Sequence, residues 1–434
     1  MMFKKLCCII LTIALACSLS ACDFLISDGD ALLSPPRLEG ELYYIQEALI
    51  DYAGEDITLK YPTAGEYRSA FILRDINGDG TNEAIAFYSR TEDSTVTMHI
   101  NLMTKEDGWK SKGDIGIVGS GVEKVIFRDL AGDGVEEISV GWSIYGSVDR
   151  QVGIYSFDGN QLTQRTLESY TDFLTVDIDA DNEEELFVIN LNLNDKTATA
   201  KAFSVNESGI EEKGIATLDG SVTSYYAPVV SKLADGRTAV YIDAVKGSGT
   251  LTELVWFESE GLKSLYDGKA EATTATYRPS IVSSRDFNND GIIDIPLQSL
   301  LLSTKDKEDF DKVYVTDWSF FDGEKLNKSV SALMNYADGY YITIPKNRQD
   351  SLHLARKTES RLRIFYSYDA KKGTQGKEVF RVLVISKNDF ESGKASGYDL
   401  IKEKGNICFL ARVSEDNELG FTLDELINNF GIIE

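Results

Sequence analysis

Histidine is scarce in this sequence of 434 residues, and so are the motifs that usually mark an enzyme. There are two histidines, His99 and His353, which lie far apart and outside the spacings typical of zinc ligands. The sequence contains neither a Gly-x-Ser-x-Gly nucleophile elbow nor a phosphate-binding loop. No catalytic constellation is therefore recognisable, although the many carboxylates leave a glycosidase-like pair as an open alternative.

Positive charge is also in short supply. The 44 lysines and arginines face 70 aspartates and glutamates, which gives a formal net charge of -26. Such an acidic chain repels the phosphates of nucleic acid and anionic lipid, so we expect no nucleic-acid partner. It attracts divalent cations instead.

The first residues have the three-part layout of a secretory signal. Lys4 and Lys5 precede the apolar stretch Leu6–Ala16, which is too short for a membrane-spanning helix. Leu19–Cys22 reads Leu-Ser-Ala-Cys and resembles the bacterial lipobox. The resemblance implies removal of residues 1–21, lipid on Cys22 and a position at the extracytoplasmic face of the bacterial cell membrane. The alternative is an ordinary secretory signal in which Cys22 is incidental.

Cysteine is too rare for a disulfide framework. Of the five cysteines, Cys7, Cys8 and Cys17 leave with the signal and Cys22 takes the lipid, so Cys408 stands alone. We therefore expect the fold to be held by core burial or by metal. Beyond the signal, residues 22–40 are expected to form a lipid-anchored tether.

Five segments of the sequence resemble one another. They cover residues 74–83, 128–137, 176–185, 232–236 and 285–294. In the four well-preserved copies the second residue is an aspartate, and these aspartates are separated by 54, 48 and 109 residues. The short copy divides the longest interval nearly in half. The chain is thus organised in modules of about 50 residues.

Each module contains further strand signals. An apolar run precedes each of five pairs that are Asp-Gly or similar to it, and Asp-Gly is a typical hairpin turn. The glycines of these pairs are Gly108, Gly159, Gly209, Gly261 and Gly323. Another apolar run directly follows each good acidic segment, so a module predicts four strands. Such a sheet cannot bury both faces alone, and radial stacking solves this. We predict a mainly β fold: a β-propeller of about five to seven four-stranded blades, followed by a small α+β C-terminal domain. A β-sandwich array is the alternative.

The acidic segments share the pattern Asp-x-Asx-x-Asp-Gly-x-x-Glu/Asp. Over roughly residues 71–323 this resembles the calcium loops of FG-GAP and VCBS repeats, as in the integrin alpha-subunit propeller, although the Phe-Gly and Gly-Ala-Pro signatures are absent. The resemblance implies structural calcium that staples a blade. Calcium prefers six to eight oxygen ligands, which carboxylates at alternate loop positions supply. The expected ligands are Asp75, Asn77, Asp79 and Glu83; Asp177, Asp179, Asp181 and Glu185; and Asp286, Asn288, Asp290 and Asp294.

The copies differ in how well they fit this pattern. The first and last are the best candidates, whereas in the third Asn182 replaces the glycine. In the second, Ala131 stands where a ligand belongs, so we expect weak binding or none. The alternative, favoured for the second and the short copy, is that the aspartates only make turns with backbone NH groups. None is an EF-hand, because position twelve lacks the bidentate glutamate.

The remaining segments complete the predicted organisation. An apolar stripe that includes Ile45 and Leu49 predicts a helix over residues 39–53, so residues 41–335 would form the propeller with its N-terminal helix. In residues 336–434, Thr422 opens a capping box before a short helix that Gly431 would end. The basic cluster of this domain predicts a solvated strand face rather than an anion-binding face; its members are Arg356, Lys357, Arg361 and Arg363.

The predicted function is that of a lipid-anchored binding or scaffold protein without catalysis. Its partners would be the membrane, through the lipid, and an unidentified surface protein or polysaccharide. Trp109, Trp142 and Tyr145 are candidate contacts for sugar or peptide. The alternative is a propeller-fold enzyme that acts on a polysaccharide or another cell-wall polymer.

Overall fold

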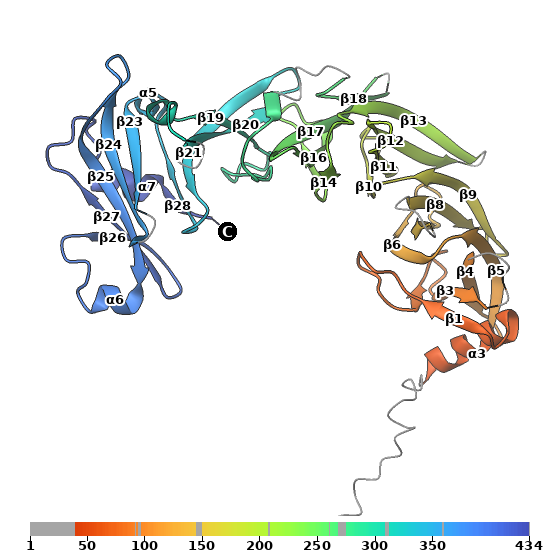
Figure 1. Cartoon of the computed structure of the whole chain (residues 1–434). Coiled ribbons are helices and arrows are strands. Elements are labelled where there is room, and N and C mark those ends of the chain that lie inside the picture. The colour runs from red at the N-terminus through yellow and green to blue at the C-terminus, as the bar shows by residue number, and fades with distance from the viewer. Residues whose placement is uncertain are drawn as a thin grey trace, which may run out of the picture. The chain divides into compact units, whose positions relative to one another are not determined.

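The computed structural model describes residues 40–433, apart from several short gaps. The gaps are 92, 94–96, 145–149, 207–208, 260, 268–274, 309–311 and 358–359. The predicted signal, the tether and Cys22 therefore lie outside the described residues. Within them the chain is mainly β, as predicted (Figure 1). No described helix is both long and apolar enough to span a bilayer.

The chain divides into two compact units. The first comprises the residues up to Lys124 together with Phe157–Thr163. It holds the predicted helix, α3 (Glu41–Ala53), and one antiparallel sheet in the order β1-β3-β4-β5, with β2 also paired to β3. The bounds are β1 (Ile57–Lys60), β2 (Phe71–Arg74), β3 (Glu83–Arg90), β4 (Thr97–Lys105) and β5 (Trp109–Val118). Ile45 and Leu49 bury the apolar stripe of α3 against this sheet.

Three sheets follow in chain order, two of four strands and one of five. The division between the two units passes through the first of them, which has the order β6-β7-β8-β9. The bounds are β6 (Gly121–Arg128), β7 (Glu137–Ser143), β8 (Arg150–Phe157), β9 (Leu162–Ser169), β10 (Asp172–Val176), β11 (Glu185–Asn192), β12 (Thr197–Asn206), β13 (Gly209–Leu218), β14 (Ser224–Tyr225), β15 (Val229–Lys232), β16 (Thr238–Lys246), β17 (Gly249–Glu258) and β18 (Gly261–Ser264). The second sheet is β10-β11-β12-β13, and the third is β14-β16-β17-β18 with β15 paired to β16.

Two five-stranded sheets complete the second unit. Their orders are β19-β20-β21-β22-β28 and β23-β24-β25-β27-β26. The bounds are β19 (Ile295–Leu300), β20 (Tyr314–Phe321), β21 (Leu326–Asn335), β22 (Tyr340–Thr343), β23 (Leu352–Lys357), β24 (Leu362–Asp369), β25 (Thr374–Ser386), β26 (Asp399–Lys404), β27 (Ile407–Val413) and β28 (Phe430–Ile432). The domain boundary expected at residues 335/336 falls between β21 and β22, which pair with each other.

Short helices join some of these strands. They are the single 3-10 turn η1 (Leu302–Thr304), α5 (Lys346–Gln349), α6 (Lys387–Glu391) and α7 (Leu423–Asn429). Thr422 caps α7 as predicted, since its hydroxyl accepts a hydrogen bond from Glu425 N at 3.1 Å. Gly431 does not end this helix. The helix stops at Asn429 because Phe430 turns into β28, which pairs with β22.

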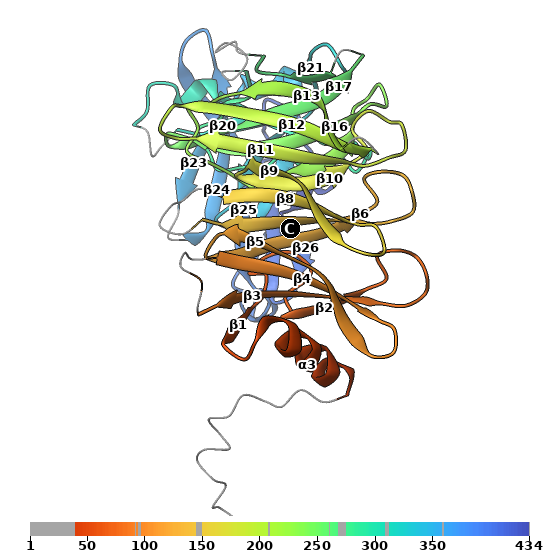
Figure 2. The same ribbon diagram turned by 90° about the vertical axis from the view of Figure 1, so that its right-hand side faces the viewer.

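Within the second unit, successive sheets pack on one another through their apolar side chains. The side chains of β11 alternate, so that Leu186 and Val188 pack on Ile154 of β8 while Phe187 and Ile189 face the sheet of β16. Both faces of β11 are buried, which explains its continuous apolar run. Similar clusters join the sheet of β16 to that of β19 and the latter to that of β24. The neighbouring strands β11 and β12 can be followed in Figure 2.

Candidate metal centres in the acidic loops

The acidic loops occupy the same place in successive sheets. Asp75 lies between β2 and β3, Asp129 between β6 and β7, and Asp177 between β10 and β11. Asp286 precedes β19, where a single bridge between Arg285 and Asp294 stands in for the missing strand. Each of the first three loops thus joins two neighbouring, paired strands of one sheet. The short copy at residues 232–236 occupies the corner between β15 and β16 but forms only a tight turn.

The four loops share one backbone frame. The fourth and sixth residues of each adopt positive φ angles, a region that favours glycine. The sixth position holds Gly80, Gly134 and Gly291 in three loops, and Asn182 takes it with φ 74° in the third. Asparagine tolerates this conformation better than most residues. The missing glycine that argued against the third loop therefore does not disrupt it.

In the first loop, backbone amides satisfy the leading aspartate. Asp75 accepts hydrogen bonds from Asp79 N at 3.1 Å and from Gly80 N at 2.9 Å. Asn77 donates to the Asp79 carboxylate at 3.1 Å. The closing residue, Glu83, is buried and accepts from Ile76 N at 2.9 Å. Burial raises the pKa of Glu83. The loop is therefore held by hydrogen bonds among its own groups.

The last loop repeats this arrangement and adds a further donor. Asp286 accepts from the amides of Asp290 and Gly291 at 3.1 and 2.8 Å. The buried Asp294 accepts from Phe287 N at 3.2 Å and from the Ser329 hydroxyl at 2.7 Å. Both of its oxygens are therefore engaged, and Asn288 bonds to Asp290 at 2.7 Å.

In the second loop the closing carboxylate is fully hydrogen-bonded. Glu137 accepts from Leu130 N at 2.9 Å and from the Ser156 hydroxyl at 3.1 Å, so both carboxylate oxygens are used. Asp129 accepts from two loop amides, as Asp75 and Asp286 do in the first and last loops. With Ala131 offering no side-chain oxygen, these contacts describe a closed turn.

The third loop differs, because its carboxylates converge without enough donors. One oxygen from each of Asp177, Asp179 and Glu185 lies within 4.8 Å of the others, and no other such group of His, Cys, Asp or Glu occurs in the described part of the chain. Asp177 Oδ1 and Glu185 Oε1 are buried and have no hydrogen-bond partner. Burial raises the pKa of Glu185 to about 7, with Asp179 and Asp181 adding to the shift. Unpaired buried carboxylate oxygens are costly and call for a cation.

A lysine from another strand pairs with two of the carboxylates in this loop. Lys213 of β13 places Nζ 2.9 Å from Asp179 Oδ2 and 3.3 Å from Asp181 Oδ2. These two carboxylates raise the pKa of Lys213. The sequence carried no signal for this contact, because Lys213 lies 34 residues from Asp179 along the chain. Glu185 Oε1 and Asp177 Oδ1 still have no hydrogen-bond partner when Lys213 makes these contacts.

The structure ranks the loops as candidate metal sites in a different order from the sequence. The sequence favours the first and last loops on their glycines and asparagines, whereas only the third brings unpaired ligand atoms together. In the other two, each asparagine donates to the neighbouring aspartate. Ten of the twelve predicted ligands lie in the loops, and Glu83 and Glu185 are the first residues of β3 and β11. Calcium at any of them stays a prediction.

Two other predicted surfaces are corrected by burial. Trp142 is fully buried and donates to the Tyr155 hydroxyl at 3.0 Å, so it is a core residue rather than a ligand contact. Trp109 is partly buried beside α3, and Tyr145 lies outside the described residues. In the basic cluster, Arg363 is 7% exposed and does not belong to a solvated strand face.

No protein-family model matches this chain, and no curated protein matches its sequence. Among solved structures, a protein from Lactobacillus plantarum aligns with a TM-score of 0.31 and 10% identity over 72% of this chain and 84% of its own. A rhamnogalacturonan lyase from Bacillus licheniformis aligns with a TM-score of 0.30 and 14% identity, over 80% and 83%. The periplasmic gluconolactonase of Pseudomonas aeruginosa gives 0.27 and 12%, over 75% and 89%. At these TM-scores none of the likenesses carries an inference for this chain.

Proposed function

We propose that this protein is a lipid-anchored binding or scaffold protein of the bacterial cell surface, built on calcium-stabilised β-propeller repeats. The repeated corner supports the propeller: three acidic loops and one short turn each join two paired neighbouring strands of a sheet, and the fourth loop joins the bridge at Arg285 to β19. Five to seven blades of the FG-GAP or VCBS type remain the proposed arrangement. The partner would be a surface protein or a polysaccharide.

The unpaired oxygens of the third loop carry the calcium part of the proposal. Asp177, Asp179 and Glu185 present hard oxygen ligands within one cluster, and two of those oxygens have no donor. Calcium accepts such ligands at flexible geometry, with waters completing its shell. Asp181 would join the site, and Lys213 would give up its contact to it as the cation enters. The role of the ion would be structural.

The direct test is the thermal stability of the full-length protein with and without calcium. A ligand present at about 100 times its Kd stabilises by about 2.7 kcal/mol. We therefore expect excess calcium to raise Tm by at least ~2 °C over the protein in chelator. Glu185→Gln should abolish most of this rise, because it removes the buried anion and keeps the shape.

The matched control for that variant is Glu137→Gln. Glu137 occupies the same position in the second loop, but both of its oxygens already have donors. The calcium-dependent part of its Tm should equal that of the unchanged protein. Equal melting curves in calcium and chelator, or equal losses in both variants, would refute a cation at the third loop.

The alternative, an enzyme acting on a polysaccharide or another cell-wall polymer, would need a carboxylate pair beside a cleft. Carboxylates do gather at one hollow of the described chain, where Asp235, Glu258, Asp322 and Glu324 surround Arg237. The cavity between the last two sheets has no aspartate or glutamate among its described lining residues. Incubation with neutral and acidic polysaccharides, followed by assay of new reducing ends and of unsaturated products, separates the two functions. Turnover that exceeds a heat-denatured control would replace the binding proposal.

A further inference from the structure

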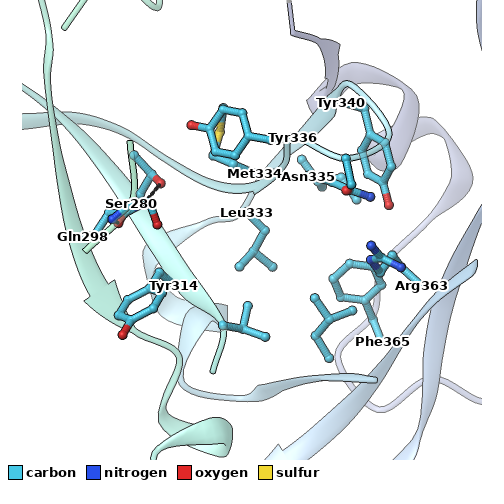
Figure 3. A pocket seen from close by; sticks show the side chains of 15 residues that line it. Ser280, Gln298, Tyr314, Leu333, Met334, Asn335, Tyr336, Tyr340, Arg363 and Phe365 are labelled. Carbon is cyan, nitrogen blue, oxygen red and sulfur yellow. Dashed lines mark hydrogen bonds between the residues drawn. The ribbon is translucent and has the colours of Figure 1, made fainter. Parts of the chain in front are cut away.

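A cavity of about 220 Å³ opens between two sheets of the second unit. Tyr314 and Leu333 line it from the sheet of β19–β22, and Leu354 and Phe365 line it from β23 and β24. Figure 3 shows Arg363 and Phe365 on one side and Tyr314 on the other. The cavity is smaller than a typical pocket for a drug-sized molecule, which suits a small ligand.

Arg363 is the charged group in the described lining, and it is poorly compensated. Its side chain is 9% exposed, and Nη1 has no hydrogen-bond partner. Its Nη2 lies 3.7 Å from Asp338 Oδ2, which is beyond hydrogen-bonding distance. A buried guanidinium nitrogen without an acceptor loses its hydrogen bonds to water and gains none in the protein, which is unfavourable. Native proteins seldom leave a buried polar group without a hydrogen-bond partner.

The nearest carboxylate is already engaged by other donors. Asp338 accepts from Arg361 Nε at 2.6 Å and from Asn335 Nδ2 at 2.9 Å. Two guanidinium groups thus share one carboxylate, and the closer contact belongs to Arg361. One positive charge at the cavity wall is left without a matching anion among the described residues.

We propose that the cavity binds a small organic acid whose carboxylate pairs with the Arg363 guanidinium and whose body is apolar. The carboxylate matches the charge and fork geometry of the guanidinium. The apolar body matches the walls, which are mostly aliphatic and aromatic: Val313, Leu333, Ile342, Leu354, Tyr340 and Phe365. The proposal rests on the binding function stated above, because it names a ligand class for it, but it uses none of the calcium loops.

Benzoate is the probe for this proposal, and benzyl alcohol is its uncharged counterpart. Titration calorimetry on the full-length protein should show benzoate binding at least ~10-fold tighter than benzyl alcohol, the minimum expected of one charge-assisted hydrogen bond in a buried site. Arg363→Met, which keeps the length of the side chain and removes the charge, should weaken benzoate at least ~10-fold and leave benzyl alcohol nearly unchanged.

Two further variants guard against an effect on folding. Arg381→Met removes an arginine of the same sheet that pairs with Glu378 outside the cavity, and it should not change either affinity. Tyr336→Ala alters an exposed residue of the cavity wall and should weaken both probes. If Arg363→Met fails to fold, the benzoate preference and Tyr336→Ala decide the question.

The outcomes separate this proposal from the proposed function. Absence of benzoate binding, equal affinities for the two probes, or benzoate binding unchanged by the cavity variants would overturn the cavity proposal, leaving Arg363 with ordered water only. The calcium effect on Tm would be untouched by such a result. Retained benzoate binding without any calcium effect would instead overturn the calcium part of the proposed function.

Discussion

At the scale of single residues, the second unit depends on one buried ion pair. Arg278 is fully buried outside the regular strands, and its Nη2 lies 2.8 Å from Asp243 Oδ1 on β16. Thr252 and Ser284 also donate to Asp243. The pair therefore attaches the segment around Arg278 to the sheet, since Arg278 also bonds to Val282 O at 2.6 Å.

Removing this arginine should be costly. Arg278→Met leaves Asp243 buried without its cation, and we expect the free energy of unfolding to fall by about 3–5 kcal/mol in urea titrations. Arg278→Met combined with Asp243→Asn should lose less, because no unpaired charge remains. A single variant as stable as the unchanged protein would show that water replaces the ion pair.

A second residue-scale network predicts a pH dependence in the first unit. His99 lies between two carboxylates, with Nδ1 2.8 Å from Asp114 and Nε2 3.1 Å from Asp93. These hydrogen bonds, that of Asp114 first, raise the pKa of His99 in spite of burial. Tyr88, which donates to Asp114 at 2.6 Å, and Arg90 face the same group.

The raised pKa of His99 determines how the stability of the first unit changes with pH. A histidine with a raised folded pKa stabilises fully below its unfolded pKa of about 6.5, and the stabilisation is lost as pH rises through the folded value. Amide exchange in β4 should therefore become faster, relative to intrinsic rates, between neutral and alkaline pH. His99→Gln should remove this dependence. An unchanged dependence in the variant would assign it to other groups.

At the scale of elements, the acidic loops show how one motif acquires different chemistry. The leading aspartate and the left-handed backbone positions are local, so all four copies form the same turn. The closing carboxylate is buried in each, but its second oxygen meets Ser156 in one sheet and Ser329 in another. Glu185 meets no such hydroxyl. Whether the closing carboxylate is fully hydrogen-bonded is thus set by a neighbouring strand.

The C-terminal helix offers a test at the same scale. Thr422→Ala removes the hydroxyl that accepts from Glu425 N, and we expect a loss of about 1 kcal/mol in stability. Thr422→Ser keeps the acceptor and should stay within a few tenths of a kcal/mol. Chemical denaturation of both variants measures the difference, and equal losses would show that the cap contributes nothing.

At the scale of the whole molecule, the proposed lipid anchor predicts how the protein partitions. In the bacterial host, the full-length protein should enter the detergent phase on Triton X-114 separation, because two or three acyl chains hold a protein stably to a bilayer. Cys22→Ser should move it to the aqueous phase. Cys408→Ser, at a buried free cysteine, should not. Aqueous partitioning of the unchanged protein would contradict lipidation.

The sequence alone determined the modules, because strand alternation, Asp-Gly turns and the acidic loops are local patterns whose spacing survives folding. It placed the acidic loops at the corners of successive sheets and the helices at residues 39–53 and after Thr422; the first of these is observed as Glu41–Ala53. Only the tertiary structure decided which loop lacks hydrogen-bond donors, and that Arg363 faces a cavity rather than solvent. Both depend on side chains from other strands, such as Lys213 and Ser329, and contacts between residues distant in sequence leave no local periodicity to read.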